Sequence, residues 1–311
     1  MEKKKILIIG SLNMDMDIQM ERMPECGETV MGRSITYVPG GKGANQACAA
    51  GKMQGRVAML GCIGDDSFGE RQRENLAAAG VDVSYLSVEK KVPTGMAIIY
   101  IDDAGNNHIV VVPGANDRCS VDYIRKNREL LEEADYVVFQ MEIPYDTIFY
   151  GIREAKRLGK TVILNPAPVP DDLPEDIWGK IDYLTPNEKE LCRLSQVTGD
   201  RIEDYERGAW KLLEKGVGNV LVTLGSKGAL FMNRQEKYLV PARKVQAVDT
   251  TAAGDCFHGA FLTGISEGMT VKEAIWMANL ASSIAVTRKG AQSSLPERTE
   301  VDTILTYIWE V

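Results

Sequence analysis

The sequence has few of the residues that most often build metal sites and nucleophile sites. Its 311 residues include only two histidines, His108 and His258, and six cysteines, none of which forms a CxxC pair. A histidine-based triad, a histidine-rich metal site, a zinc knuckle and a disulfide framework therefore have little raw material. Carboxylates must do most of the acid and base chemistry.

Long hydrophobic runs and an excess of positive charge are missing as well. No apolar run is long enough to cross a bilayer, and the apolar stretch near the start is too short for a signal peptide. We therefore expect a cytoplasmic protein with no membrane partner. The formal net charge of −8 disfavours a general nucleic-acid binder, which needs a basic face. Any anionic ligand must be held locally.

The two most familiar phosphate-binding motifs do not occur. The pattern GxxxxGK[ST] is absent, and GGKGAN at 40–45 lacks the spacing of the GxGxxG dinucleotide fingerprint. A phosphate site in this chain must be built in another way.

Short runs rich in Val, Ile and Leu alternate with segments of helical spacing over most of the chain. They predict strands at 5–10, 56–61, 136–140, 161–164 and 219–225, and helices at 66–79, 120–132, 146–158 and 202–215. This alternation is typical of a doubly wound, mostly parallel α/β sheet with helices on both faces. We expect residues 1–311 to form a single domain.

Two β-rich segments, 15–38 and 94–116, interrupt this alternation. They contain strand-like residues without intervening helices, and the turn-rich DDAGNN of the second predicts a hairpin. We infer a small β-sheet lid built from two separate pieces, about 12–38 and 94–113. Residues 96–101 are apolar on both alternating faces, which suits a sheet that covers a site and also meets a partner. An ordinary buried strand explains 96–101 equally well.

The segment VDTTAAGDCFHGAF, residues 248–261, places Asp255 directly after a run of very small residues. Apolar residues at helical spacing predict a helix that begins at about Ala253 or Gly254. The backbone N–H groups of Ala252, Ala253 and Gly254 then lie at the positive end of this helix and form a cradle for an anion. In that position Asp255 can accept a proton from a hydroxyl that attacks the anion. A simple helix cap explains Asp255 equally well on this segment alone.

Three motifs occur in an order that resembles one protein family. DTTAAGD at 249–255 resembles the DTxxxGD signature of the carbohydrate kinase family that includes ribokinase, fructokinase and adenosine kinase. GGKGANQACAAGK at 40–52 resembles the other signature of that family, and TPNEKE at 185–190 resembles its NxxE motif. The resemblance covers essentially the whole chain, including the two β-rich pieces, which correspond to the lid of the family. It implies an ATP-dependent sugar kinase in which Asp255 is the general base and the amides of Ala252, Ala253 and Gly254 form the anion hole.

Within the family the chain is most similar to the ribokinase group, which implies D-ribose as the acceptor and its 5-hydroxyl as the phosphorylated group. Asn13 and Asp15 lie two residues apart in an extended segment, so both point to one side, where they can grip neighbouring hydroxyls. The resemblance assigns the remaining sugar contacts to Gly41, Lys42, Asn45, Glu142 and Asp255. Other acceptors remain open, namely deoxyribose, fructose and adenosine, as does a sugar-binding protein without turnover.

The resemblance also implies a nucleotide site and two cation sites. It assigns ATP to Asn187, Thr223, Gly225, Ser226, Gly228, Gly254 and Asn279. Glu190 of the NxxE motif is expected to hold Mg²⁺ through water. An activating monovalent cation, usually K⁺, is implied at Asp249, Thr251, Ala285, Arg288, Gly290 and Ser294. A helix cap, a tight turn and ordinary helix positions are the simpler explanations of the nucleotide residues.

Two further expectations come from the family. Its members are usually homodimers joined through their lids, which agrees with the two-faced apolar segment 96–101. Many members have glycine where Ala252 stands, and we expect alanine there to require a negative φ.

Overall fold

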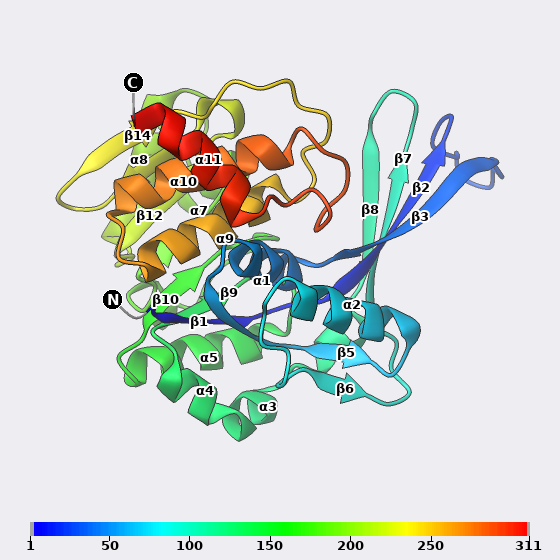
Figure 1. Cartoon of the computed structure of the whole chain (residues 1–311), viewed down its shortest axis with the longest axis horizontal. Helices are drawn as coiled ribbons and strands as arrows, with labels where there is room; N and C mark the ends of the chain where they lie inside the picture. The colour runs from blue at the N-terminus through cyan, green and yellow to red at the C-terminus, as the bar shows by residue number, and fades with distance from the viewer. Residues whose placement is uncertain (1–2, 310–311) are drawn as a thin grey trace.

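The computed structural model describes residues 3–309, and in the last helix it describes side chains as far as residue 306 (Figure 1). Its central sheet has eight strands in the order β14-β13-β12-β11-β10-β9-β1-β4. All pairs are parallel except those of β13 and β14 at one edge. The bounds are β1 Lys5–Ile9, β4 Arg56–Leu60, β9 Tyr136–Phe139, β10 Thr161–Leu164, β11 Tyr183–Leu184, β12 Asn219–Thr223, β13 Ala229–Met232 and β14 Lys237–Val240. The predicted α/β class with a mostly parallel sheet is confirmed.

Helices cover both faces of this sheet, because alternate strand residues point to opposite sides. In β1, Ile6 and Ile8 belong to one hydrophobic core, and Leu7 and Ile9 belong to the other. The first core is covered by α1 Lys42–Lys52, α2 Ser67–Ala78, α9 Ala253–Ser266, α10 Val271–Ala285 and α11 Arg298–Trp309. The second is covered by α3 Val121–Lys126, α4 Arg128–Glu133, α5 Tyr145–Arg157, α6 Glu175–Trp178, α7 Glu188–Ser195 and α8 Ile202–Glu214.

The helix predicted at 120–132 is divided into α3 and α4 at Asn127. The Asn127 side chain donates to the carbonyl of Tyr123 at 2.9 Å. Asparagine side chains compete with the helical backbone in this way, so the division has a local cause.

The two β-rich segments form a separate four-stranded sheet in the order β3-β2-β7-β8, which projects from the body in Figure 1. Its strands are β2 Asn13–Met20, β3 Gly32–Gly40, β7 Gly95–Ile101 and β8 Asn107–Val112. Residues 96–101 therefore lie in the middle of this small sheet, and the alternative of an ordinary strand in the main core is wrong. A further pair, β5 Cys62–Gly64 and β6 Ser87–Glu89, and the short helices η1 Gly114–Arg118 and η2 Gly225–Lys227 complete the described elements.

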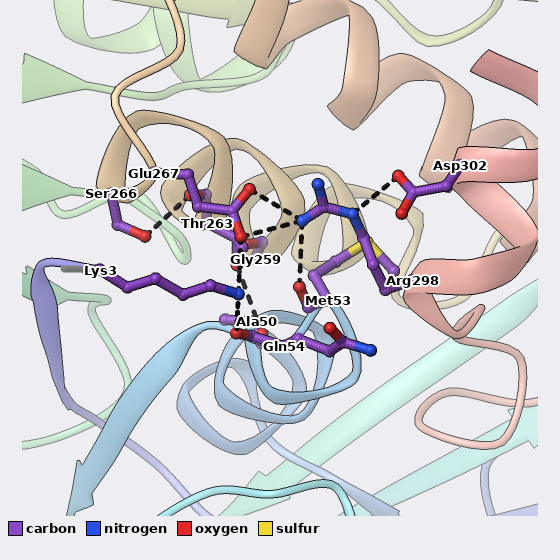
Figure 2. Close-up of polar contacts among 10 residues, drawn as sticks. All are labelled: Lys3, Ala50, Met53, Gln54, Gly259, Thr263, Ser266, Glu267, Arg298 and Asp302. Carbon is purple, nitrogen blue, oxygen red and sulfur yellow. Dashed lines mark hydrogen bonds and ion pairs between the residues drawn. The ribbon is translucent and has the colours of Figure 1, made fainter. Parts of the chain in front are cut away.

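A cluster of charged side chains ties the beginning of the chain to its last helix (Figure 2). Arg298 of α11 contacts both carboxylate oxygens of Glu267, at 3.0 and 2.9 Å, and also Asp302 at 2.8 Å. Lys3 pairs with the same Glu267 at 2.8 Å and donates to the carbonyl of Gln54 at 2.8 Å. The cluster therefore holds α11 against the ends of α1 and α9. Within residues 3–309, no helix is both long and apolar enough to cross a bilayer.

Candidate active site

The loop before α9 turns sharply into the helix at Ala252. The helix begins at Ala253, as the sequence predicts, and Ala252 has φ 56° and ψ 12° in the left-handed region. The expectation of a negative φ at Ala252 is wrong. The N–H of Ala253 donates to the carbonyl of Thr250 at 3.2 Å, so this turn reverses the chain immediately before the helix. The left-handed conformation is strained for residues that have a Cβ, and alanine has the smallest side chain among them.

The turn leaves backbone donors free at the positive end of the helix dipole. In the described part of the chain, the N–H groups of Ala252, Gly254 and Asp255 donate to no protein acceptor, whereas the N–H of Ala253 is used by the turn. Unpaired N–H groups at a helix N-terminus favour a bound anion. The observed cradle is therefore centred on Gly254 and its neighbours.

Asp255 is buried, and α1 holds its carboxylate. The Asn45 amide donates to Oδ2 at 3.0 Å, and the Gln46 amide donates to Oδ1 at 3.1 Å. Neither oxygen accepts a bond from the first turn of α9 itself, so Asp255 does not cap its own helix. The carbonyl oxygen of the Asn45 side chain is buried without a partner among residues 3–309. It can accept a hydrogen bond from a ligand hydroxyl.

Asn13 and Asp15 lie on one side of β2, at the root of the small sheet. Asn13 pairs with Gly40 and Gly95 on the flanking strands, and its side-chain oxygen accepts from the Asn116 amide at 2.7 Å. Burial, helped by the nearby carboxylates of Asp17, Glu142 and Asp255 and opposed by Lys42, raises the pKa of Asp15 to about 7. The charges of Asp15 and Asp255 are therefore close enough to influence each other.

The turn into α1 brings the other expected sugar residues to the same place. Gly41 has φ 88°, and a Cβ there would lie 2.6 Å from the backbone nitrogen of Asn13, so only glycine fits. Glu142 accepts from the Ser11 hydroxyl at 2.6 Å and from the Lys42 N–H at 3.0 Å. Burial acts to lower the pKa of the Lys42 ammonium, but the carboxylates of Asp255, Glu142, Glu190 and Asp15 raise it above its ordinary value. Lys42 is therefore a cation among acids.

A cavity of about 770 Å³ lies at the start of α9, where Ala253 and Gly254 line it. This volume is within the range of sites for small ligands and cofactors. All seven residues expected at the nucleotide line it: Asn187, Thr223, Gly225, Ser226, Gly228, Gly254 and Asn279. The Asn279 amide donates to the carbonyls of Val240 and Pro241 at 3.0 and 3.3 Å, which anchors one wall of the cavity.

Asn187 and Glu190 form a capping box at the start of α7. The Asn187 side chain accepts from the Glu190 N–H at 2.9 Å, and Glu190 accepts from the Asn187 N–H at 2.9 Å. The helix-cap reading of Asn187 is therefore correct as geometry, and Asn187 also lines the cavity. Burial raises the pKa of Glu190, although Asn187 and Lys42 oppose this. Glu190 follows Asn187, Glu188 and Lys189, which line the cavity, and a partly buried carboxylate suits a cation that keeps its own water ligands.

The residues expected at a monovalent cation lie around one loop contact. Asp249 accepts from the N–H and hydroxyl of Thr251 at 2.9 and 2.6 Å, and from the N–H of Gly290 at 2.9 Å. Burial acts to raise the pKa of Asp249, but these hydrogen bonds hold it below its ordinary value. The Ala285 carbonyl accepts from the Arg288 N–H at 3.0 Å, and the Ser294 hydroxyl donates to Ala291. Among residues 3–309 no hydrogen bond ends on the carbonyls of Thr251, Arg288, Gly290 or Ser294. Free oxygen donors are what a hard cation requires, so this loop fits K⁺.

Several residues at the site are not anticipated by the sequence patterns. Gln46 donates a hydrogen bond to Asp255, and Asn116 donates one to Asn13. Arg243 and Lys244 line the nucleotide cavity. The adjacent basic pair at 243–244, just before the small-residue run, was an available signal. Asn116 offered none, because its contact with Asn13 spans 103 positions.

Comparisons with known proteins assign this arrangement to a family. Residues 3–298 match the model of the pfkB family carbohydrate kinases. The chain is 36% identical to a ribokinase of Haemophilus influenzae over 298 residues, which cover 96% of this chain and 97% of the relative. It is 37% identical to a deoxyribokinase of Salmonella typhi over 291 residues, covering 94% and 95%. A structure of Arabidopsis thaliana ribokinase complexed with ribose and ATP superposes with a TM-score of 0.90 at 33% identity, covering 98% of this chain and 99% of that chain.

Proposed function

The chain belongs to the pfkB family of carbohydrate kinases, and on that premise we propose that it transfers the γ-phosphate of ATP to the 5-hydroxyl of D-ribose. Its relatives named ribokinase support ribose, and the structural neighbour bound to ribose and ATP supports the pair of substrates. The product of this reaction is D-ribose 5-phosphate.

The start of α9 supports the proposal most, because Gly254 and Asp255, adjacent in the chain, contact two different groups of residues. Gly254 lines the cavity expected to hold ATP. The charges of Asp15 and Lys42 lie close enough to Asp255 for their pKa values to depend on it. Several hydrogen-bonding side chains at a buried site select a ligand rich in hydroxyls, because an analogue that lacks a hydroxyl leaves them unpaired.

The transfer follows from these positions. Asp255 takes the proton of the 5-hydroxyl while that oxygen forms a bond to the γ-phosphorus in line, and the bond from phosphorus to the bridging oxygen breaks with its electron pair on ADP. The N–H groups at the start of α9, with Gly254 at their centre, stabilise the charge that grows on the phosphoryl oxygens. Lys42 lies among the carboxylates and offsets their repulsion of the anionic nucleotide.

Two cations complete the proposed site. Glu190 would hold Mg²⁺ through water, with Asn187 beside it, and the ion would neutralise phosphate charge when bound. Asp249, Thr251, Ala285, Arg288, Gly290 and Ser294 would hold K⁺ and so order the loop that leads into the cradle.

The small sheet formed by β2, β3, β7 and β8 is proposed as the lid of the sugar site. Its closure would exclude water, which otherwise competes with the sugar for the phosphoryl group.

The outer strand β8 exposes Ile109, Val110, Val111 and Val112, each about half exposed. A second copy of this chain would bury these residues in a homodimer joined through the lids. Sedimentation as a monomer at micromolar concentration would contradict the dimer.

A second acceptor has specific support. The 37% identity to a deoxyribokinase lies within the range of identities to relatives and solved structures named ribokinase, so 2-deoxyribose is the alternative substrate. The two sugars differ only in the 2-hydroxyl, and both carry the 5-hydroxyl that Asp255 would deprotonate.

The product distinguishes the proposed reaction from its rivals. The purified chain would be incubated with ATP, Mg²⁺ and D-ribose, and the product examined by ³¹P NMR. A phosphate on O5 couples to two equivalent or near-equivalent methylene protons, whereas a phosphate on O1 couples to one. A product with a single coupled proton contradicts transfer to the 5-hydroxyl.

A further inference from the structure

Gln46 is a fully buried amide of α1 that contacts the carboxylate of Asp255. Its Nε2 donates both to Asp255 Oδ1 and to Asn165 Oδ1, each at 3.1 Å. Its Oε1 accepts from the Gln140 amide at 2.8 Å. Asn45 also contacts Asp255. The family resemblance places Asn45 at the sugar, whereas it assigns Gln46 to no site.

The direction of these hydrogen bonds is set by a backbone group. The Asn165 amide donates to the carbonyl of Thr185 at 2.9 Å, and a carbonyl can only accept. The side-chain oxygen of Asn165 must therefore face Gln46, which must present its NH₂ group to that side. The same NH₂ group contacts Asp255. Gln46 can therefore only donate a hydrogen bond to the Asp255 carboxylate.

We propose that Gln46 is a positioning residue for the transfer, which holds the Asp255 carboxylate in the orientation in which it receives the proton of the sugar hydroxyl. This role rests on the proposed function because it takes Asp255 as the general base. With Asn45 on Oδ2 and Gln46 on Oδ1, each carboxylate oxygen accepts one amide donor, so rotation of the carboxylate would break both bonds. The amides of Gln140 and Asn165 prevent Gln46 itself from turning.

The other charged and titratable groups around Asp255 come from four elements. Asp15 lies on β2, Lys42 on α1, Glu142 after β9 and Glu190 on α7, and on α9 itself the neighbours are Cys256 and His258. Burial lowers the pKa of His258 to about 4 and raises the pKa of Cys256 to about 12, so both stay neutral near pH 7. The amide of Gln46 bonds to none of these six groups, so its replacement acts first on Asp255.

Two substitutions test the role. Gln46→Leu removes the donor at similar volume, and Gln46→Glu keeps the shape but places a second carboxyl group against Asp255. A displacement of a reacting group by about 1 Å lowers rates by about 100-fold, so we expect kcat to fall by ~10-fold to ~100-fold in both variants. KM for the sugar should stay within about threefold, because the hydrogen bonds of the Gln46 side chain all go to protein groups, namely Asp255, Asn165 and Gln140. The acid limb of the kcat profile should also move to higher pH, and further in Gln46→Glu, because a lost donor and a nearby like charge both favour the protonated carboxyl.

Two controls separate this role from a loss of folding and from a failure of the proposed function. Asn219→Leu removes an amide that donates to the carbonyl of Asp182 at 2.9 Å. Asn219 is the first residue of β12 and lies at the end of the strand opposite to the site. The substitution should lower the melting temperature without moving the acid limb. Asp255→Asn should lower kcat by at least ~100-fold; if it does not, the general base is misassigned and both proposals fail. If Asp255→Asn is inactive but both Gln46 variants keep kcat within twofold and an unmoved acid limb, only the role of Gln46 is overturned. A fall in kcat with an equal loss of sugar affinity would also overturn it, since that indicates a collapsed site.

Discussion

Asn45 donates a hydrogen bond to Asp255 at 3.0 Å, although 210 positions separate the two residues in the chain. The contact joins the start of α1, which carries the sugar-side glycines, to the start of α9, which carries the anion cradle. It explains how a carboxylate can lie at a helix N-terminus without capping that helix. The two signature-like segments of the sequence therefore lie together in the fold, and α1 and α9 pack against each other.

Asp15 should make sugar capture sensitive to pH near neutrality. Its pKa is raised to about 7 by burial and by Asp17, Glu142 and Asp255. Only the ionised carboxylate accepts hydrogen bonds from two sugar hydroxyls, so kcat/KM for ribose should fall as the pH decreases through about 7. Asp15→Asn should lower kcat/KM and remove this limb. A limb that persists in Asp15→Asn would assign it to another group.

The same shift has a consequence for stability. The folded pKa of Asp15 is about 7 and the ordinary value is 3.8, so the folded state binds the proton more tightly than the unfolded state. Stability from this group is present below pH 4 and is lost as the pH rises to about 7. At pH 8, Asp15→Asn should therefore raise the melting temperature by about 2 °C or more. An equal melting temperature at pH 8 would contradict the buried, high-pKa carboxyl.

Ala252→Gly should stabilise the protein slightly. Left-handed backbone costs an L-residue about 1–2 kcal/mol, and the added freedom of glycine in the unfolded chain returns about 0.4–1 kcal/mol of this. We expect a net gain of about 0.5 kcal/mol and a melting temperature higher by about 1–2 °C. Ala253→Gly is the matched control, because Ala253 is helical and should lose about 1 kcal/mol. Destabilisation by both variants would show that Ala252 is not strained.

Arg298→Met should destabilise the fold without changing the chemistry. Arg298 is only 15% exposed and serves Glu267 and Asp302, and its loss leaves Glu267 with Lys3 alone. The exposure of this cluster is intermediate between that of a surface ion pair and that of a buried one. Its loss should lower the free energy of unfolding by roughly 2 kcal/mol and the melting temperature by about 4 °C. Arg193→Met removes the exposed pair with Asp171 and should leave the melting temperature unchanged. Comparable effects of the two variants in differential scanning fluorimetry would contradict this ranking.

Monovalent cations should control turnover through the loop at Asp249. Replacing K⁺ by tetramethylammonium at constant ionic strength should lower kcat by at least ~5-fold, the low end of coupling between ligand sites. Asp249→Asn should reduce the difference between the two salts. Equal rates in both salts would remove the cation from the proposed site.

The sequence predicted those parts of the structure that depend on local pattern. Strand and helix periodicity placed the main strands and the start of α9, and the family resemblance named residues that line one cavity together. The left-handed Ala252 was missed because alanine was taken to require a negative φ, although the glycine of many family members at that position is typical of a positive φ. The Gln46 and Asn116 contacts were missed because they depend on tertiary packing between distant segments, and a buried amide has no periodic signature.

The most direct test of the proposed reaction is ATP consumption by the wild type and Asp255→Asn with D-ribose, 2-deoxyribose, fructose and adenosine in turn. We expect the wild type to turn over ribose fastest, and Asp255→Asn to bind ribose but to lose at least ~100-fold in kcat, as for loss of a general base. Ribose binding would be measured separately by calorimetry. Wild-type turnover confined to another acceptor would contradict the roles given to Asn13, Asp15 and Glu142, and near-normal turnover by Asp255→Asn would contradict the general base.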